Sequence, residues 1–389
     1  MIASPNELSP TRLHLGVRHL AAGAALLALT GAAVLAGDVP PAHAARVNAT
    51  CANTTADAAT IQTAINSSAA GDEIVIKGPC LINATISLAD DRTYRGDGAG
   101  TTLKQANGAN LKAMLASAPW VANNTWVGSG VRVERLTLDG NSANNTGTSP
   151  LVLQTWDSRV YDIRVYNAPV DAILLTTVTA NGTQITNTAV NNVLSDIYIE
   201  GAGGSGIHGH DPANLLTDTV IERSWIAGTG GSAVATDNAA GWQIRDLHLY
   251  EVTKNGIDAN RCYNTGIHDN YIEDFGSQGT SGTTYYGIRC TVQDKAPSSI
   301  SGNTINQFGT FPSTGTFVYI GLDGVNGGGT GFVSVTGNGV LGKGTTRETG
   351  LNYQKGSGTA LTVASTGNVV TSVGTARTVG TGVTVSAGV

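Results

Sequence analysis

A short apolar pattern, repeated along most of the chain, constrains the fold more than any other feature of the sequence. Two apolar pairs separated by a polar residue come first, as in Val131–Asp139 and Val160–Asn167, and a glycine-containing turn then leads to a third short apolar segment. The third segments begin at five positions that lie 34, 27, 23 and 31 residues apart: Ala172, Gly206, Ala233, Gly256 and Gly287. Alternation of apolar and polar residues indicates strands, and repetition at a few tens of residues indicates a solenoid. Because few helical stretches intervene, the sequence predicts a β-helix, a coil of short parallel strands.

The first 44 residues have the layout of an export signal. Arg12 and Arg18 precede an apolar run from Leu20 to Leu35, and Ala42 and Ala44 supply small residues for cleavage. We therefore expect residues 1–44 to be a secretory signal peptide that is cleaved near Ala44. A membrane anchor is the alternative, but the run is short for a span and is interrupted by Gly and Thr. The mature protein is expected to be secreted, with no membrane partner after the signal is removed.

Composition excludes one class of partner and suits the solenoid. The net charge is −6 and the pI is about 5.6, so the chain offers no basic surface for nucleic acid. Charged residues make up 13% of the chain and Gly contributes 51 residues, which suits tight turns between stacked, uncharged strands.

The four cysteines fall into two local pairs, Cys51 with Cys80 and Cys262 with Cys290. Export favours two disulfides over free thiols.

The N-terminal part of the mature chain predicts a cap. A helix is expected from Asp57 to Ala69, with Asp57 as its capping residue and with Ala58, Ile61, Ala64 and Ile65 on one face. A strand is expected within residues 71–78, after an irregular lead-in over residues 45–56. A helix in front of the first strand would cover the open end of the solenoid.

Three segments carry a resemblance to a known family. They are Asp57–Asn66, Glu73–Lys77 and Tyr94–Leu103, the last of which contains a G-x-G-x-x-T-x-L sequence. Together they resemble the N-terminal signature of pectate-lyase-like proteins. The resemblance extends through the repeats over about residues 50–340. It implies an all-β fold, a single-stranded right-handed parallel β-helix over residues 45–340. Residues 341–389 would then form final coils or a C-terminal cap, with a separate binding module as the alternative.

The predicted strands bring polar residues to one face. We align the five predicted strands on their first inward residue. These residues are Ile173, Ile207, Val234, Ile257 and Ile288. The residues that alternate with them should then point outward on successive coils. We predict catalytic roles for His208, Asp211, Asp237, Asp258 and Arg261, and substrate-binding roles for His210, Arg289 and Asn260. A hydrogen-bonded ladder of turn residues is the alternative, with Asn238 and Asn260 as its best candidates. The mixed set of acids, bases and cations favours chemistry, provided that the alignment is correct to one residue.

The resemblance implies a polysaccharide or oligosaccharide substrate and leaves two reactions open. In a lyase, Asp211, Asp237 and Asp258 would hold Ca²⁺, and Arg261 or Arg289 would act as the base or bind the uronate carboxylate. In a hydrolase, two of these carboxylates would flank the glycosidic bond. We therefore expect a secreted enzyme that cleaves glycosidic bonds by β-elimination or hydrolysis. The alternative is a non-catalytic glycan-binding or surface β-helix, because the family also contains spikes without this activity.

The sequence departs from two patterns within that family. The histidine segment Gly206–Asp211 precedes the acidic strands and no Arg-x-Lys follows, unlike the order found in polygalacturonase-like hydrolases. No Lys occurs in the predicted rows, unlike lyases built on a Lys/Arg pair. Trp120, Trp126 and Trp156 are candidates for sugar stacking, although core or loop packing is the alternative.

Overall fold

The computed structural model describes residues 44–98, 100–293, 296–326 and 329–388. The predicted signal peptide lies, apart from Ala44, outside the described residues. Within the described ranges, neither helix has the length and apolar character needed to cross a membrane.

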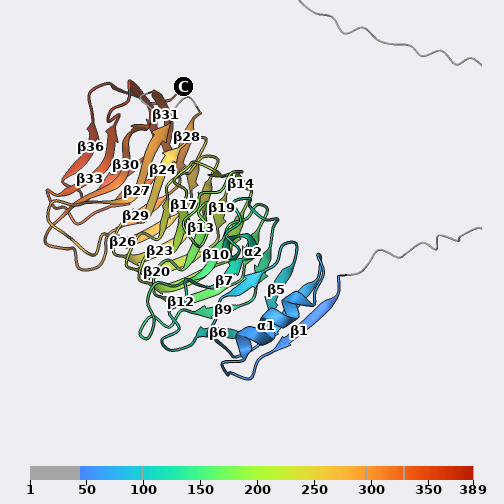
Figure 1. Ribbon diagram of the computed structural model, residues 1–389. Coiled ribbons are helices and arrows are strands. Elements are labelled where there is room, and N and C mark those ends of the chain that lie inside the picture. The colour runs from blue at the N-terminus through green and yellow to red at the C-terminus, as the bar shows by residue number, and fades with distance from the viewer. Residues whose placement is uncertain (1–43, 99, 294–295, 327–328, 389) are drawn as a thin grey trace, which may run out of the picture. The chain divides into compact units, whose positions relative to one another are not determined.

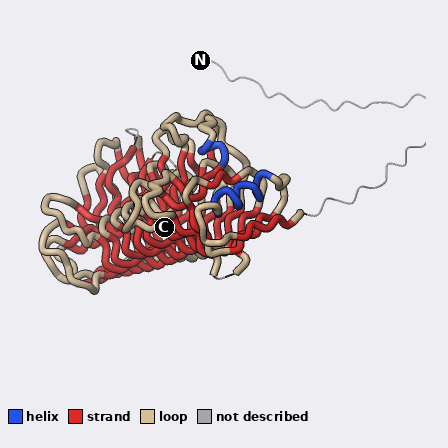
Figure 2. The backbone as a smooth tube through the Cα atoms, turned by 60° about the horizontal axis from the view of Figure 1, so that its bottom comes forward, coloured by secondary structure: helices blue, strands red, loops and turns tan. Residues whose placement is uncertain are grey.

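From the first coil onward, the chain winds through three parallel sheets and returns to the same sheet after each circuit. Figure 1 shows this winding as a colour sequence that runs from blue through green to red along the stack of strands, and Figure 2 shows strands of successive coils side by side. Of the residues that the structure describes, only 4% are helical. The fold is a right-handed parallel β-helix, which confirms the predicted fold class.

Sheet I contains the first strand of each circuit. In its hydrogen-bonded order its strands are β1 (Arg46–Thr50), β2 (Glu73–Lys77), β5 (Thr93–Gly96), β8 (Arg132–Glu134), β11 (Arg159–Tyr161), β15 (Val193–Ser195), β19 (Val220–Glu222), β22 (Gln243–Arg245), β25 (Gly266–His268), β28 (Ser298–Ser301), β31 (Thr330–Thr336), β34 (Ala360–Thr366) and β37 (Val383–Ser386).

Sheet II contains the second strand of each circuit. Its strands are β3 (Cys80–Ile82), β6 (Thr102–Gln105), β9 (Thr137–Asp139), β12 (Arg164–Ala168), β16 (Tyr198–Ala202), β20 (Trp225–Thr229), β23 (His248–Val252), β26 (Tyr271–Phe275), β29 (Thr304–Asn306), β32 (Gly339–Leu341) and β35 (Val369–Thr371).

Sheet III closes each circuit and carries the candidate site. Its strands are β4 (Ile86–Leu88), β7 (Ala113–Ser117), β10 (Ser149–Leu153), β13 (Ile173–Thr176), β17 (Ile207–His210), β21 (Val234–Thr236), β24 (Ile257–Cys262), β27 (Thr284–Gln293), β30 (Thr316–Asn326), β33 (Glu348–Gln354) and β36 (Thr375–Val379). A separate two-stranded pair joins β14 (Ala189–Val190) to β18 (Leu216–Thr217).

Inward side chains of the three sheets form one apolar core. On sheet III, Ile173, Ile207, Val234, Ile257 and Ile288 pair in register from coil to coil, and each is fully buried. The inward row predicted from the sequence is therefore confirmed. Alternation at period two produces this row because successive strand residues point to opposite faces of a sheet.

From β8 onward, the turn between sheets I and II is two residues long, and its first residue has a left-handed backbone. Asp196, Asp246 and Asp269 adopt φ values of 56° there, and Gly302 and Gly337 take the same place in later coils. Asx residues and glycine tolerate this conformation better than other residue types. This requirement explains the polar residue or glycine between the two apolar pairs of each repeat.

An asparagine ladder stabilises the same turn in the C-terminal coils. Asn270, Asn303 and Asn338 are buried, and each donates a side-chain hydrogen bond to the Oδ1 of the asparagine on the next coil, with Asn368 as the last acceptor. Each also donates to a backbone carbonyl of the preceding coil. The expected ladder thus exists, but at a turn different from that of Asn238 and Asn260.

We expect Asn303→Ala to lower the free energy of unfolding by about 2–3 kcal/mol, because it removes the side-chain acceptor of the buried Asn270 amide and the side-chain donor to the Ile267 carbonyl. Denaturant unfolding measures the loss. The matched control is Asn83→Ala at an exposed position, which should change stability by less than about 0.5 kcal/mol. Equal stability of the two variants would contradict the ladder.

The N-terminal cap differs in detail from the prediction. Helix α1 (Asp57–Asn66) ends three residues earlier than expected, and the lead-in contains strand β1. Asp57 is not the capping residue, because Ala56 occupies that position. Instead the buried carboxylate of Asp57 accepts hydrogen bonds from the backbone of Ala52, Thr54 and Leu81. Burial alone would raise the pKa of Asp57, but these bonds outweigh burial and lower the pKa.

Both predicted disulfides are present. Cys51–Cys80 ties the cap to the first coil, with Cα atoms 5.2 Å apart, and Cys262–Cys290 joins the neighbouring strands β24 and β27, with Cα atoms 6.0 Å apart.

Residues 341–389 contribute strands β33 to β37, which pair with earlier strands of sheets I, II and III. This stretch therefore continues the same three sheets.

Candidate active site

Sheet III presents the predicted polar rows on its outer face. His208 pairs in register with Ala235, Ala235 with Asp258, and Asp258 with Arg289, as the sequence alignment predicted. His210 lies two residues after His208 on β17 and projects from the same face. The centroids of the two imidazole rings are 5.8 Å apart.

Each of these histidines forms a hydrogen bond with a carboxylate. His208 Nδ1 lies 2.8 Å from Asp171 Oδ2, and His210 Nδ1 lies 3.0 Å from Asp237 Oδ2. A carboxylate on Nδ1 fixes the orientation of an imidazole and leaves Nε2 as the nitrogen that can exchange a proton with a bound molecule. The structure therefore brings two carboxylate-supported imidazoles together on one strand.

The hydrogen bond between His210 and Asp237 shifts the pKa of each side chain in the direction that favours its charged form. The hydrogen bond to Asp237 raises the pKa of His210, although partial burial opposes the change. The same bond lowers the pKa of Asp237, aided by the backbone amide of Asp211, which donates to Asp237 Oδ2 at 3.0 Å. His210 is thereby a suitable proton donor near neutral pH, whereas Asp237 is a carboxylate that stays ionised.

Asp211 points inward, contrary to its expected place on the polar face. It is 1% exposed, and its two oxygens accept four hydrogen bonds, from Thr177, Leu215, Leu216 and Asn238. These bonds fix the turn after β17 and the start of β18. The geometry gives Asp211 a structural role, because a carboxylate satisfied by four protein donors has no acceptor position left for a substrate.

Asp258 and Arg289 form an ion pair with each other. Arg289 Nη1 lies 2.9 Å from Asp258 Oδ1, and its Nε lies 2.9 Å from Asp323 on β30. Burial alone would lower the pKa of Arg289, but the two carboxylates outweigh it and raise the pKa. An arginine held by two carboxylates is a poor base and a weak partner for a substrate carboxylate.

Arg261 and Asn260 lie at the end of β24, where the backbone is irregular. Arg261 adopts a φ of 54°, and its Nη1 donates to Asn238 Oδ1 at 2.8 Å. Its guanidinium therefore reaches back to the coil that carries Asp237. Asn260 is half-buried, and its Oδ1 accepts the backbone amide of Arg261 at 3.1 Å.

The residues present do not fit the expected calcium site. Asp211 is satisfied by backbone and side-chain donors, and Asp258 is paired with Arg289, so the three aspartates do not offer a shared set of free oxygens. His208, His210 and Asp237 form a different set. Each of them offers one ligand atom, and these three atoms lie within 4.8 Å of one another. Two imidazole nitrogens and one carboxylate suit a transition metal better than Ca²⁺.

Sequence reasoning missed Asp171. It immediately precedes the small residue Ala172 before β13, is mostly buried, and accepts the backbone amide of Ser205 at 2.7 Å in addition to its bond with His208. A signal was present, because Ser205, Ser232 and Asn255 occupy the same place before the next three sheet III strands. An acidic residue among these small polar residues marks the coil that supports His208.

Comparisons with known proteins identify the fold class. No protein-family model matches the sequence, and no curated protein sequence matches it. A polygalacturonase from Erwinia carotovora is 13% identical, with a TM-score of 0.57 over 89% of this chain and 98% of that chain. The A-module of a mannuronan C-5 epimerase from Azotobacter vinelandii is 16% identical, with a TM-score of 0.52 over 87% and 96%.

A third similar structure is the tailspike protein of an E. coli bacteriophage, solved in complex with a pentasaccharide. It is 12% identical, with a TM-score of 0.53, and the match covers 87% of this chain and 65% of that chain. At such low identities these matches define the fold alone. The chain has the right-handed parallel β-helix fold of these structures.

Proposed function

We propose that this chain is an exported enzyme that cleaves glycosidic bonds of a uronate-containing polysaccharide by β-elimination. The observation that carries the proposal is the pair of carboxylate-supported histidines, His208 and His210, on the outer face of sheet III. The fold similarity to a polygalacturonase, an epimerase module and a glycan-bound tailspike supports a carbohydrate substrate. The two disulfides and the N-terminal apolar run support export.

The reaction requires a base for the C5 proton and an acid for the leaving oxygen. In our proposal His208 Nε2 takes the C5 proton, the electron pair forms the C4–C5 double bond, and the C4–O bond breaks. The His210 imidazolium gives its proton to the departing glycosidic oxygen. Asp171 and Asp237 position the two rings, and Arg261 binds the uronate carboxylate and stabilises the charge that develops beside C5.

Hydrolysis by two carboxylates has less support from the geometry. That reaction needs one protonated carboxylic acid and one carboxylate on either side of the glycosidic bond. Asp211 is buried and satisfied, Asp258 is ion-paired, and the pKa of Asp237 is lowered rather than raised. The histidines, whose unperturbed pKa is close to neutral, are the better acid and base.

Asp237→Asn is expected to lower kcat about a hundredfold and to move the alkaline limb of the kcat–pH profile to lower pH. The carboxylate raises the pKa of His210, so its removal lowers that pKa and His210 loses its proton at a lower pH. Kinetics across the pH range measure both effects.

The matched control for this test is Asp246→Asn. Asp246 is exposed at a turn with a φ of 56°, a conformation that asparagine tolerates. This variant should keep both the rate and the pH profile. If Asp237→Asn lowers the rate equally at every pH, Asp237 has only a structural role and the assignment of His210 as the acid is wrong.

A further inference from the structure

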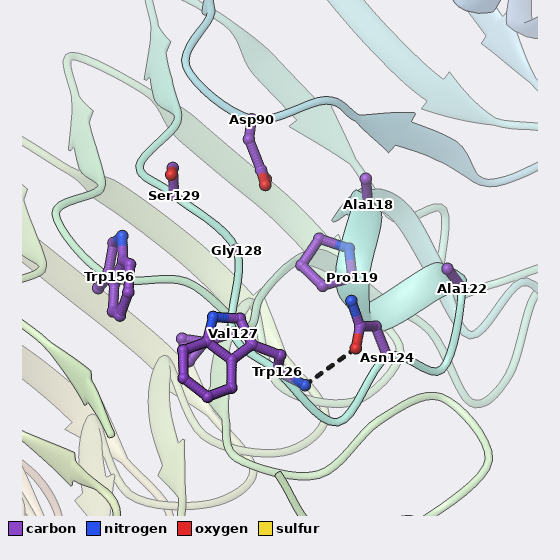
Figure 3. Close-up of a pocket in the computed structure, with 10 residues that line it drawn as sticks. All are labelled: Asp90, Ala118, Pro119, Ala122, Asn124, Trp126, Val127, Gly128, Ser129 and Trp156. Carbon is purple, nitrogen blue, oxygen red and sulfur yellow. Dashed lines mark hydrogen bonds between the residues drawn. The ribbon is translucent and has the colours of Figure 1, made fainter. Parts of the chain in front are cut away.

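A pocket lies on the part of the chain that precedes the histidine coils. Its volume is about 360 Å³, and it is formed by the turn after β4, the helix α2 (Ala118–Val121), the segment that follows α2, and the turn after β10. We call it the Trp126 pocket. Figure 3 shows Asp90, Trp126, Trp156, Pro119 and Asn124 arranged around the same space. Its volume is within the range of small-ligand sites.

Hydrogen bonds hold the walls of the Trp126 pocket in place. The segment after α2 is anchored by Val127, whose amide donates to Asn187 Oδ1 at 2.8 Å, and by the backbone oxygen of Thr125, which accepts the amide of Thr186 at 2.8 Å. Gln154 Nε2 donates to the Asn124 carbonyl at 2.8 Å. The loop between β13 and β14 thus fixes the segment that carries Trp126, and the pocket is a formed feature of the fold.

Two indoles supply apolar surface to the pocket. The Trp126 side chain is 56% exposed, which is unusual for so large an apolar ring, whereas Trp156 is half-buried against the core. Trp120, by contrast, is buried in a small cluster with Ala113, Ala116 and Val152 and has a packing role. Indole surface beside polar groups suits a ligand with one apolar face and a polar edge.

Asp90 supplies the polar group. One oxygen of its carboxylate is buried and lacks a hydrogen-bond partner, while a backbone hydrogen bond from Ser129 reaches the carboxylate. Burial raises the pKa of Asp90 despite that bond. Gly128 permits this approach, since a Cβ there would lie 2.5 Å from Asp90 Oδ1. Because Asp90 lines the pocket, its carboxylate can accept a hydrogen bond from a ligand hydroxyl.

We propose that the Trp126 pocket binds an uncharged pyranose ring of a glycan. The C–H face of the ring would contact Trp126 and Trp156, and a ring hydroxyl would donate to Asp90. A uronate in this position would place its carboxylate beside Asp90, and the like charges would repel. This inference goes beyond the proposed cleavage reaction, because the pocket would bind sugar whether or not His208 and His210 act on it.

The position of the pocket suits a polymer that also reaches the histidines. Trp156 follows β10 of sheet III, and β10 is two coils before β17, which carries His208 and His210. Coils in a parallel sheet are about 4.8 Å apart, so the separation along the stack is about 10 Å. If both proposals hold, the substrate contains neutral sugars as well as uronates.

Binding of the purified chain to neutral glycans tests the inference. Affinity electrophoresis in gels containing xylan, galactan, glucomannan or dextran gives dissociation constants, and polygalacturonate and alginate serve as acidic comparisons. We expect at least one neutral glycan to retard the chain, and Trp126→Ala and Asp90→Ala each to weaken that binding about tenfold. Phe308→Ala, which truncates a 49% exposed ring on another part of the chain, should leave binding unchanged.

Two further outcomes separate this inference from the proposed function. His210→Ala should keep the affinity for the neutral glycan, because His210 is not part of the pocket. Failure of every neutral glycan to retard the unmodified chain would overturn the inference, as would equal binding by Trp126→Ala and the unmodified chain. Neither result would bear on cleavage, which is measured separately from product formation.

Discussion

His210→Ala is expected to reduce the rate of polysaccharide cleavage by about a thousandfold. The imidazolium of His210 is the proposed proton donor to the leaving oxygen, and loss of a positioned general acid typically costs 10²–10⁴-fold in rate. Because the His210 side chain is 44% exposed, its truncation should leave the fold intact. Steady-state kinetics on the cleaved polysaccharide, together with a thermal unfolding curve, measure the two effects.

His248→Ala is the matched control for this variant. The His248 side chain is 43% exposed and lies on the outer face of sheet II, where it packs against Tyr271 with ring centroids 4.8 Å apart. We expect this variant to retain full activity. If both variants lose activity equally, or if His210→Ala remains fully active, the chemistry does not take place at the histidine pair.

Val234→Asp is expected to lower the free energy of unfolding by several kcal/mol. Val234 is fully buried between Ile207 and Ile257, so the new carboxyl would have no polar partner in the apolar stack. Burial raises the pKa of such a group above its unfolded value. The loss of stability should therefore be smallest in acid and should grow as the pH rises through and above about 4. Denaturant unfolding at several pH values measures it.

Ala235→Asp provides the comparison on the same strand. Ala235 is the next residue on β21, points outward, and is half-buried, so a carboxylate there can remain solvated. We expect this variant to lose less than about 1 kcal/mol. Similar losses in the two variants would contradict the inward and outward assignment of the strand and, with it, the outward position of the histidines.

The strands and their register were predictable because one signal was repeated many times. A one-residue error would have exposed Ile207 and buried His208, and five aligned copies made such an error inconsistent with the apolar row. The same alternation, continued one residue past His210, places Asp211 inward, where the structure has it. Grouping Asp211 with the outward face was therefore an error at the strand end.

The partners of the outward residues were harder to predict than their direction. Asp171 approaches His208 from 37 residues earlier, and its rotamer depends on the turn before β13. Arg289 was expected to be free for substrate, but its pairing with Asp323 depends on β30, a strand outside the five aligned copies. Arg261 lies within the register shift between Ala259 and Cys262, where alternation no longer applies. Turn geometry and the C-terminal coils decided these contacts.

The products formed from a panel of uronate-containing polysaccharides test the central claim most directly. Ultraviolet absorbance measures new unsaturated ends and a reducing-end assay measures every cleavage, both with and without a chelator. The account predicts that absorbance and reducing ends appear together, that His210→Ala abolishes both, and that chelator leaves both unchanged. Reducing ends without absorbance would show hydrolysis instead, and no product from any uronate polymer would show that the chain does not cleave these polymers. Either result would contradict β-elimination by the histidine pair.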